Sequence, residues 1–174
     1  MLGFYENFPE NIHRKENFTS ALSSMKLQQR IIQVLHEINC KTFSFEEITH
    51  PTVPECAVIF EVGIADAESF NYMDEQETKK VLNSLKKEPF RLIDFFCAIR
   101  YYKDKAEKKT PLKFDYYMIR NVFGENAMET RVFHERGPRY ISPEDIVTFL
   151  VNKVNEAAAR KTLKRFEPPQ QEII

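Results

Sequence analysis

The chain has 174 residues, of which 43% are hydrophobic and 29% are charged, and its formal net charge at pH 7 is −1. This length and composition predict one globular domain that buries enough surface to fold without a metal ion or a disulfide. The near-neutral charge excludes a global electrostatic field that would attract nucleic acid or an acidic membrane, although a local basic surface stays open.

The cysteines and the N-terminal residues indicate the expected compartment. Cys40, Cys56 and Cys97 are odd in number, widely spaced and form no C-x-x-C pair, so neither a disulfide framework nor a zinc site is predicted. Free thiols favour a cytoplasmic protein. The N-terminal residues carry scattered charges without an apolar run, and no stretch of about 18 apolar residues occurs. We therefore expect no secretory signal and no membrane contact.

The first third of the chain predicts one helix and two strands. Apolar residues at helical spacing predict a helix over residues 24–39, with one of the two serines at its start as the cap. A short strand is expected at 42–45, followed by a proline-containing loop. Residues 56–66, CAVIFEVGIAD, are mostly apolar and often β-branched, which predicts a buried strand.

The middle of the chain predicts a short helix and three strands. Asp74 and Glu77 have the spacing of a capping box, which opens a helix over residues 75–87. Three β-rich stretches with short polar connections follow and predict an antiparallel meander. These stretches are residues 90–103, 111–123 and 128–137.

The last predicted helix begins after Ser142, the expected cap, with Pro143 at the first helical position. An apolar stripe favours a helix to about Phe166, followed by an extended tail over residues 167–174. Because the stripe needs an apolar partner, this helix is expected to cover one face of the sheet. The predicted class is α+β: an antiparallel meander of four to five strands, an N-terminal helix, a short middle helix and a long C-terminal helix packed on one face. All of it is assigned to a single domain, residues 1–166.

Alternation along the three meander strands assigns each side chain to a face. In the simplest register, the core face carries odd-numbered residues of the first strand beside even-numbered residues of the next two, including His134. The same register aligns Arg100, Asp115 and Glu135 on the other face. We interpret this row as a cross-strand charge ladder rather than a polar site, and a slip of one residue would exchange the faces.

The stretch RVFHERGPRYISPEDIVTFLV, residues 131–151, joins the last strand to the last helix and carries the candidate sites. A helix N-terminus beside guanidinium groups favours a bound anion, which makes Arg120, Arg136 and Arg139 candidate anion-binding residues. However, acidic residues already stand in the first helical turn, and the Gly-Pro pair is explained by a sharp turn. The stretch is therefore interpreted mainly as a structural joint.

His134 is the candidate catalytic residue. It falls on the predicted core face near Tyr116 and Arg120, where an imidazole can act as a general acid–base. No nucleophile or second base is placed beside it by the pattern, so a hydrogen-bonded structural role is the stronger interpretation.

No metal site and no cofactor are predicted. His36 and Cys40 stand one helical turn apart, and Cys56 could be a third ligand, but the set has no motif spacing. The four glycines are too scattered for a phosphate-binding loop.

The leading hypothesis is a non-enzymatic binding or interaction module, for a protein partner or for a small anionic ligand near residues 131–145. One alternative is a small metal-independent enzyme acting on an anionic substrate, with His134 as the acid–base. A second alternative is a single-stranded nucleic-acid binder that stacks bases on the aromatic strands 90–123. The near-neutral charge and the lack of an RNA-recognition consensus disfavour that alternative.

These hypotheses predict different surroundings for the same residues. An enzyme needs His134, Arg120 and Arg136 in one concave pocket with free donors. A binding module pairs these groups internally and leaves an aromatic patch or the C-terminal tail for its partner. A helix packed on a curved antiparallel sheet can also leave a cavity between them, which is a usual place for a small ligand.

Overall fold

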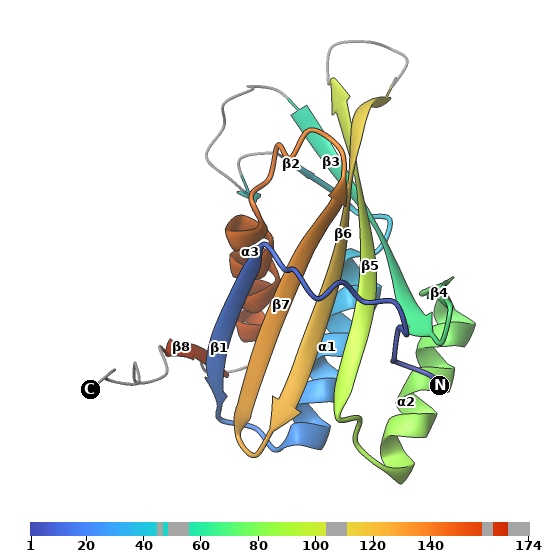
Figure 1. The fold of residues 1–174 in the computed structure, drawn as a ribbon, viewed down its shortest axis with the longest axis vertical. Coiled ribbons are helices and arrows are strands. Elements are labelled where there is room, and N and C mark those ends of the chain that lie inside the picture. Colours follow the sequence, from blue (N-terminus) through green and yellow to red (C-terminus); the bar gives the residue numbers. More distant parts are fainter. Residues whose placement is uncertain (45–46, 49–55, 104–110, 158–161, 167–174) are drawn as a thin grey trace.

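The computed structural model describes residues 1–44, 47–48, 56–103, 111–157 and 162–166. Within these residues, three helices and eight strands form the fold (Figure 1). In chain order they are β1 (Arg14–Ser20), α1 (Ser24–Ile38), β2 (Thr42–Ser44), β3 (Cys56–Asp66), β4 (Ser69–Tyr72), α2 (Glu75–Lys87), β5 (Leu92–Lys103), β6 (Pro111–Gly124), β7 (Ala127–Arg136), α3 (Pro143–Glu156) and β8 (Leu163–Phe166). The predicted tail over residues 167–174 lies outside the described residues.

The strands form a single antiparallel sheet in the order β2-β3-β5-β6-β7-β1-β8, with β4 paired to the end of β3. The mixed helix-and-sheet class and the antiparallel pairing are confirmed. The predicted number of four to five strands was wrong, because β1, β4 and β8 were missed. These segments are short or rich in polar residues, and they carry no apolar alternation that would predict a strand. They are strands because their backbones pair with neighbouring strands.

The helix starts agree with their capping signals. Ser23, Asp74 and Ser142 are the N-caps of α1, α2 and α3, and the side chain of each accepts a hydrogen bond from the backbone N–H three residues later. Each cap satisfies one of the free N–H groups that every helix start leaves. No helix among the described residues is long and apolar enough to cross a membrane.

The end of the last helix was predicted wrongly. Helix α3 ends at Glu156 rather than near Phe166, and residues 163–166 form the strand β8. The Asn155 side-chain oxygen accepts hydrogen bonds from the backbone N–H groups of Thr162 and Leu163, at 2.9 and 2.8 Å. This amide fixes the returning chain beside the last turn of the helix, so that β8 can pair with β1.

Helices α1 and α3 lie on the same face of the sheet, and α2 packs against α1 (Figure 1). We call the covered face the inner face and the opposite one the outer face. The core lies between the helices and the inner face, and it contains buried apolar residues of α1, of α3 and of the sheet. Examples are Leu27 and Ile31 of α1, Ile146 and Phe149 of α3, and Phe95 and Ile119 of the sheet.

The register predicted for the meander was wrong by one residue in β6. Cys97 lies opposite Tyr117 and Ile99 lies opposite Asp115, so the odd-numbered residues of β6 face inward. The turn between β6 and β7 has two residues, Glu125 and Asn126, between the paired Gly124 and Ala127. A two-residue turn in place of the assumed three-residue join exchanges the faces of β6 relative to β7.

The charge row predicted from that register does not exist. Asp115 is buried on the inner face, whereas Arg100 lies on the outer face and forms an ion pair with Glu61 of β3. Glu135 is exposed near the end of β7, next to an irregularity in its pairing with β6.

Candidate functional site

The joint between β7 and α3 is built around a buried carboxylate. Asp115 is fully buried and accepts hydrogen bonds from four donors. They are the Tyr101 hydroxyl (2.6 Å), His134 Nε2 (2.8 Å) and the backbone N–H groups of Arg139 (2.7 Å) and Tyr140 (3.0 Å). The donors replace the water that an ionised carboxylate would otherwise bind, so the charge can remain inside the protein.

A sharp turn after β7 brings the two backbone donors to this carboxylate. Gly137 has a φ of +115°, and a Cβ atom at this position would lie 2.3 Å from the Phe114 carbonyl oxygen and 2.4 Å from Asp115 Oδ1. Arg139 also has a positive φ, +58°. Only glycine fits position 137 without displacing β6. The turn is thus packed directly on β6 and held there by Asp115.

His134 faces Asp115 and Tyr117, not the predicted neighbours Tyr116 and Arg120, because of the shifted register. Its side chain is 11% exposed, and its ring lies edge-on to the Tyr117 ring with the centroids 5.0 Å apart. The hydrogen bond to Asp115 assigns the proton to Nε2. Among the described residues, the Asp115 carboxylate is the one group that hydrogen-bonds to the His134 ring.

A second histidine sits beside the joint. His13 Nδ1 accepts a hydrogen bond from the backbone N–H of His134 at 2.9 Å, and its ring stacks on Phe133 with a centroid distance of 4.9 Å. Partial burial lowers the pKa of His13, and the positive charge of Arg139 lowers it further. A lowered pKa agrees with the hydrogen bond, because Nδ1 can accept only when the ring nitrogen carries no proton.

Two buried phenols complete this cluster. Burial raises the pKa of Tyr101, and its hydrogen bond to Asp115 raises it further. Burial also raises the pKa of Tyr117, whose hydroxyl donates to the Ile141 carbonyl. Both hydroxyls therefore stay protonated and serve as donors. The cluster contains acid–base groups, but their hydrogen bonds are directed at one another and at the turn backbone.

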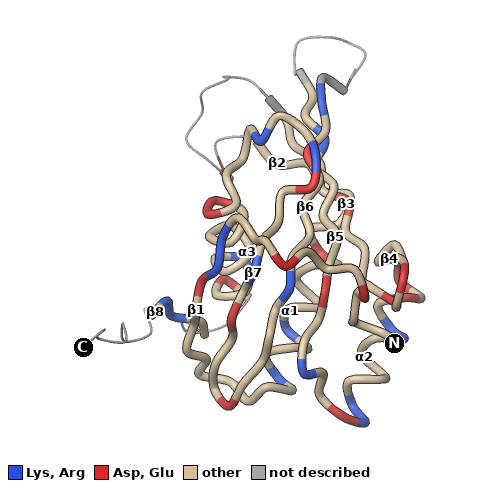
Figure 2. The backbone as a smooth tube through the Cα atoms, viewed as in Figure 1, with Lys and Arg blue, Asp and Glu red and all other residues tan. Residues whose placement is uncertain are grey.

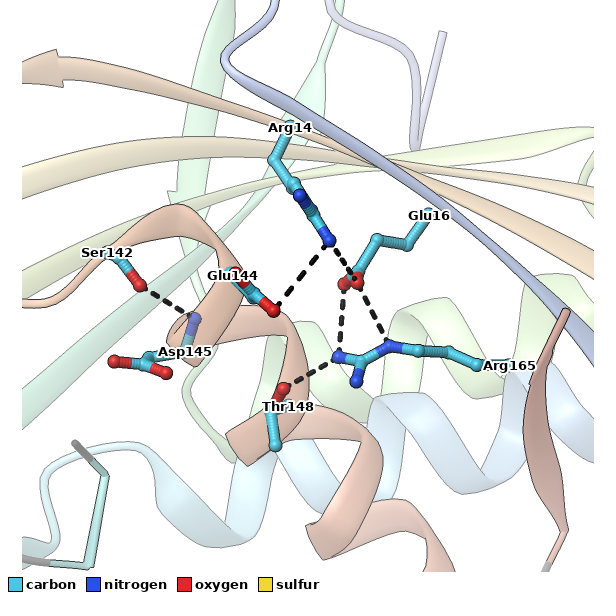
Figure 3. Close-up of polar contacts among 7 residues, drawn as sticks. All are labelled: Arg14, Glu16, Ser142, Glu144, Asp145, Thr148 and Arg165. Atoms are coloured by element: carbon cyan, nitrogen blue, oxygen red, sulfur yellow. Dashed lines mark hydrogen bonds and ion pairs between the residues drawn. The ribbon is translucent and has the colours of Figure 1, made fainter. Parts of the chain in front are cut away.

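The start of α3 is occupied by side chains of the same chain (Figure 3). Glu16 of β1, 6% exposed, is bound by Arg14 at 3.1 Å and by Arg165 of β8 at 2.9 Å. Arg14 also lies 3.8 Å from Glu144 in the first turn of α3, and Arg165 donates to Thr148 at 2.6 Å. This network ties β1, α3 and β8 together, and the acid in the first turn already uses the positive end of the helix dipole.

The three candidate anion-binding arginines are not brought together. Arg139 gives its backbone N–H to the carboxylate of the joint. Arg136 lies over the Tyr116 ring, 4.8 Å from its centroid. Arg120 lies on the outer face and makes two hydrogen bonds with Asp94, at 2.7 and 2.9 Å.

The outer face is crossed by the N-terminal segment, residues 1–13, which runs over the strands on the side opposite α1 and α3 (Figure 1). Asp94 is fully buried beneath it and accepts a hydrogen bond from the Tyr5 N–H at 2.8 Å. The Arg120 guanidinium lies 5.5 Å from the Phe4 ring centroid and 4.4 Å from that of Phe8. The Asp94–Arg120 ion pair therefore contributes a backbone hydrogen bond and cation–π contacts to this segment. Backbone hydrogen bonds also hold the segment, among them Gly3 N–H to the Ala65 carbonyl and Asp94 N–H to the Gly3 carbonyl, both at 2.7 Å.

Aromatic rings continue from this segment across the outer face. Neighbouring centroids lie 4.6, 5.4, 5.7 and 6.4 Å apart along the series. The series, here called the aromatic row, is Tyr5, Phe70, Phe96, Tyr116 and Phe114. Its last ring, Phe114, is 37% exposed.

Sequence reasoning missed the aromatic row because its members come from four separate parts of the chain. The available signal was the spacing of Phe114 and Tyr116, which puts both rings on one face of a strand. Nothing in the sequence shows that Tyr5 and Phe70 extend the same series.

Among the described residues, no group of three or more His, Cys, Asp or Glu side chains is arranged to hold a metal ion. His36 Nδ1 is hydrogen-bonded to the Thr78 hydroxyl at 3.1 Å, and the Cys40 thiol is hydrogen-bonded to the Tyr72 hydroxyl. The Cys56 side chain lies outside the described part of the chain.

Comparisons with protein-family models, with curated proteins and with solved structures found no match.

Proposed function

We propose that this protein is a non-enzymatic interaction module that binds an aromatic-bearing peptide segment of a protein partner on the outer face of its sheet. The observation that carries the proposal is the aromatic row. Tyr5 of the N-terminal segment covers one end of the row, and the row continues past it to the exposed Phe114.

The N-terminal segment serves as an internal example of such a ligand. It carries Phe4, Tyr5 and Phe8, its backbone turns at residues 1–4 and 5–8, and the outer face holds it by backbone hydrogen bonds and ring contacts. The far end of the row offers the same kinds of group: the rings of Phe114 and Tyr116 and the guanidinium of Arg136 over Tyr116. Aromatic pairs of this geometry contribute about 0.5–1.5 kcal/mol each beyond their buried area.

An enzymatic role receives less support from the same geometry. The groups suited to chemistry are engaged inside the chain: His134 with Asp115, and Arg120 with Asp94. Such pairing is what the module hypothesis requires of these residues. The joint at the start of α3 likewise directs its donors at the chain's own carboxylates, which favours the outer face over the joint as the binding surface.

Charge favours a protein partner over a nucleic acid. Basic and acidic residues are interspersed along the described backbone (Figure 2). On the outer face, Arg100 is paired with Glu61 and is not free to bind phosphate. Non-specific nucleic-acid binding depends on several unpaired cations that neutralise phosphates. Among the described residues, Arg136 is the one cation that lies over a ring of the aromatic row.

Selection from a display library of random 12-residue peptides tests the proposal. Enriched peptides would be synthesised with a fluorescent label, and their Kd measured by anisotropy for the wild type, Phe114→Ser, Tyr116→Ser and the control Lys15→Ser. Lys15 is exposed on β1, on the same face but outside the row. The urea midpoint of each variant would be measured to check that it is folded.

We expect enriched peptides with aromatic residues, and a loss of affinity of at least about tenfold for the two row variants but not for the control. Failure to enrich any peptide over an unrelated protein, or binding insensitive to Phe114 and Tyr116, would refute the proposal. If a labelled oligothymidine bound more tightly than the selected peptides and this binding depended on Phe114, the ligand class would be single-stranded nucleic acid and not a peptide.

A further inference from the structure

The outer face already holds one guanidinium between an aromatic ring and a carboxylate. The Arg120 guanidinium carbon lies 4.4 Å from the Phe8 ring centroid, and the same group makes two hydrogen bonds with Asp94, at 2.7 and 2.9 Å. A guanidinium carries five N–H donors in one plane, so it can rest against a ring and bind a carboxylate at its edge at the same time. At Arg120, both kinds of partner come from the chain itself.

Arg136, at the open end of the aromatic row, has the ring without the carboxylate. Its guanidinium carbon lies 4.8 Å from the Tyr116 ring centroid, and the residue is exposed. Within the parts of the chain that the structure describes, no carboxylate pairs with Arg136 and no acceptor receives a hydrogen bond from its side chain. The N–H edge of this guanidinium is therefore open to a group from another molecule.

The other arginines of β5, β6 and β7 are all paired with a carboxylate. The pairs are Arg100 with Glu61, Arg120 with Asp94, and Arg131 with Glu129. Arg100 lies opposite Phe114 in the pairing of β5 with β6, so a second arginine stands near the end of the row, but its charge is already balanced by Glu61. Among these four arginines, Arg136 is the one whose carboxylate would have to be supplied by a partner.

We infer that the bound peptide carries an Asp or Glu within two positions of its aromatic residue, and that Arg136 binds this carboxylate; the inference rests on the function proposed above. The peptide ring packs on Phe114, the exposed end of the row. The Phe114 and Tyr116 ring centroids are 6.4 Å apart, and Arg136 lies over the Tyr116 ring. Side chains two residues apart in an extended segment point the same way and stand about 7 Å apart, which matches this spacing.

The peptides selected on the wild type provide the probes. An enriched peptide with an acid beside its aromatic residue is labelled, together with a copy in which the corresponding amide replaces the acid. The Kd of both is measured by anisotropy for the wild type, Arg136→Gln and the control Arg91→Gln. Arg91 is exposed immediately before β5, at the opposite end of that strand from Arg100. Both variants lose one positive charge, so the comparison separates a local contact from a general effect of charge.

In the wild type we expect the amide copy to bind about fivefold more weakly than the acidic peptide, the upper range for an exposed ion pair. The two peptides should bind Arg136→Gln equally, whereas Arg91→Gln should keep the fivefold preference. The preference should also shrink in about 0.5 M NaCl, because salt screens exposed charges. The urea midpoint of each variant establishes that it is folded.

The outcomes distinguish this inference from the function on which it rests. If selected peptides bind through Phe114 but carry no acid near the aromatic residue, or if the preference for the acid persists in Arg136→Gln, the role of Arg136 is overturned and the peptide-binding function stands. If no peptide is enriched, or binding is insensitive to Phe114 and Tyr116, both are overturned together.

Discussion

Replacing Asp115 by Asn tests whether the joint depends on one buried charge. Oδ1 of Asp115 accepts from His134 and the Arg139 N–H, and Oδ2 accepts from the Tyr101 hydroxyl and the Tyr140 N–H. An Asn side chain keeps one acceptor oxygen and presents an NH₂ group to the other pair of donors. The Tyr101 hydroxyl can rotate and the His134 ring can change tautomer to accept, but a backbone N–H cannot.

The expected destabilisation follows from the hydrogen bonds that are lost. Each hydrogen bond to a charged group contributes about 1.5–3 kcal/mol, and at least one donor is left buried and unsatisfied at a similar cost. We expect the free energy of unfolding to fall by about 3 kcal/mol or more, which corresponds to a decrease in Tm of roughly 6–12 °C for a chain of this length.

Urea unfolding followed by circular dichroism measures this effect, because a change in midpoint at constant slope reports stability alone. The matched control is Glu135→Gln, which removes the charge of an exposed carboxylate on the neighbouring strand and should change stability by no more than about 0.5 kcal/mol. A loss of less than about 1 kcal/mol for Asp115→Asn would show that the turn is held by packing and not by this carboxylate.

Four further predictions concern single groups. Gly137→Ala should destabilise the fold by at least about 2 kcal/mol in the same assay, because its Cβ would lie 2.3 Å from the Phe114 carbonyl oxygen. Gly124→Ala, whose Cβ would lie 3.8 Å from Ala127, should leave the free energy of unfolding nearly unchanged. Equal losses of stability in the two variants would contradict the close approach at Gly137. Burial raises the pKa of Cys97 from 9.0 to about 12, so at pH 8 the Cys97 thiolate should be about a thousandfold scarcer in the folded protein than in the unfolded chain. In a Cys40→Ser, Cys56→Ser variant, a thiol reagent should therefore label Cys97 only upon unfolding. Folding lowers the pKa of His13 below 6.5, so as the pH falls this imidazole is protonated in the unfolded chain before it is protonated in the folded protein. The free energy of unfolding should therefore decrease below about pH 6.5. His13→Gln should flatten the dependence of Tm on pH between pH 7 and pH 5. Asp94→Asn should loosen the N-terminal segment, seen as faster hydrogen exchange of the Tyr5 amide than in the wild type. An unchanged rate would show that the ring contacts and the other backbone hydrogen bonds of the segment hold it without this carboxylate.

Much of the fold was predictable because its signals are local. The caps at Ser23, Asp74 and Ser142 are short-range hydrogen-bond motifs, and they give the helix starts directly. The meander strands are long and rich in β-branched and aromatic residues. In contrast, β8 depends on the Asn155 side chain that captures the returning backbone, and this contact has no sequence pattern that distinguishes it from a continuing helix.

The site was less predictable because it depends on the register of β6. Both faces of that strand are largely apolar or aromatic, with Phe114, Tyr116 and Met118 on one and Tyr117 and Ile119 on the other. Periodicity therefore could not decide which set faces inward, and a turn of two residues instead of three reversed the choice. The candidate residues His134 and Arg139 lie at the joint, but their neighbours could only be known from the strand pairing.

The same alternation along β6 connects the joint to the proposed binding surface. Asp115 points inward and ties down the turn before α3, while its neighbours Phe114 and Tyr116 point outward and form the open end of the aromatic row. The Phe114 carbonyl also packs against Gly137, so the turn is in direct contact with the backbone that carries the exposed Phe114 ring. Loosening the joint should therefore alter the outer face as well. In Asp115→Asn at a temperature where it is still folded, we expect weaker peptide binding than in Glu135→Gln, although Asp115 has no contact with that surface. Unchanged affinity would show that the sheet holds the row in place without the joint.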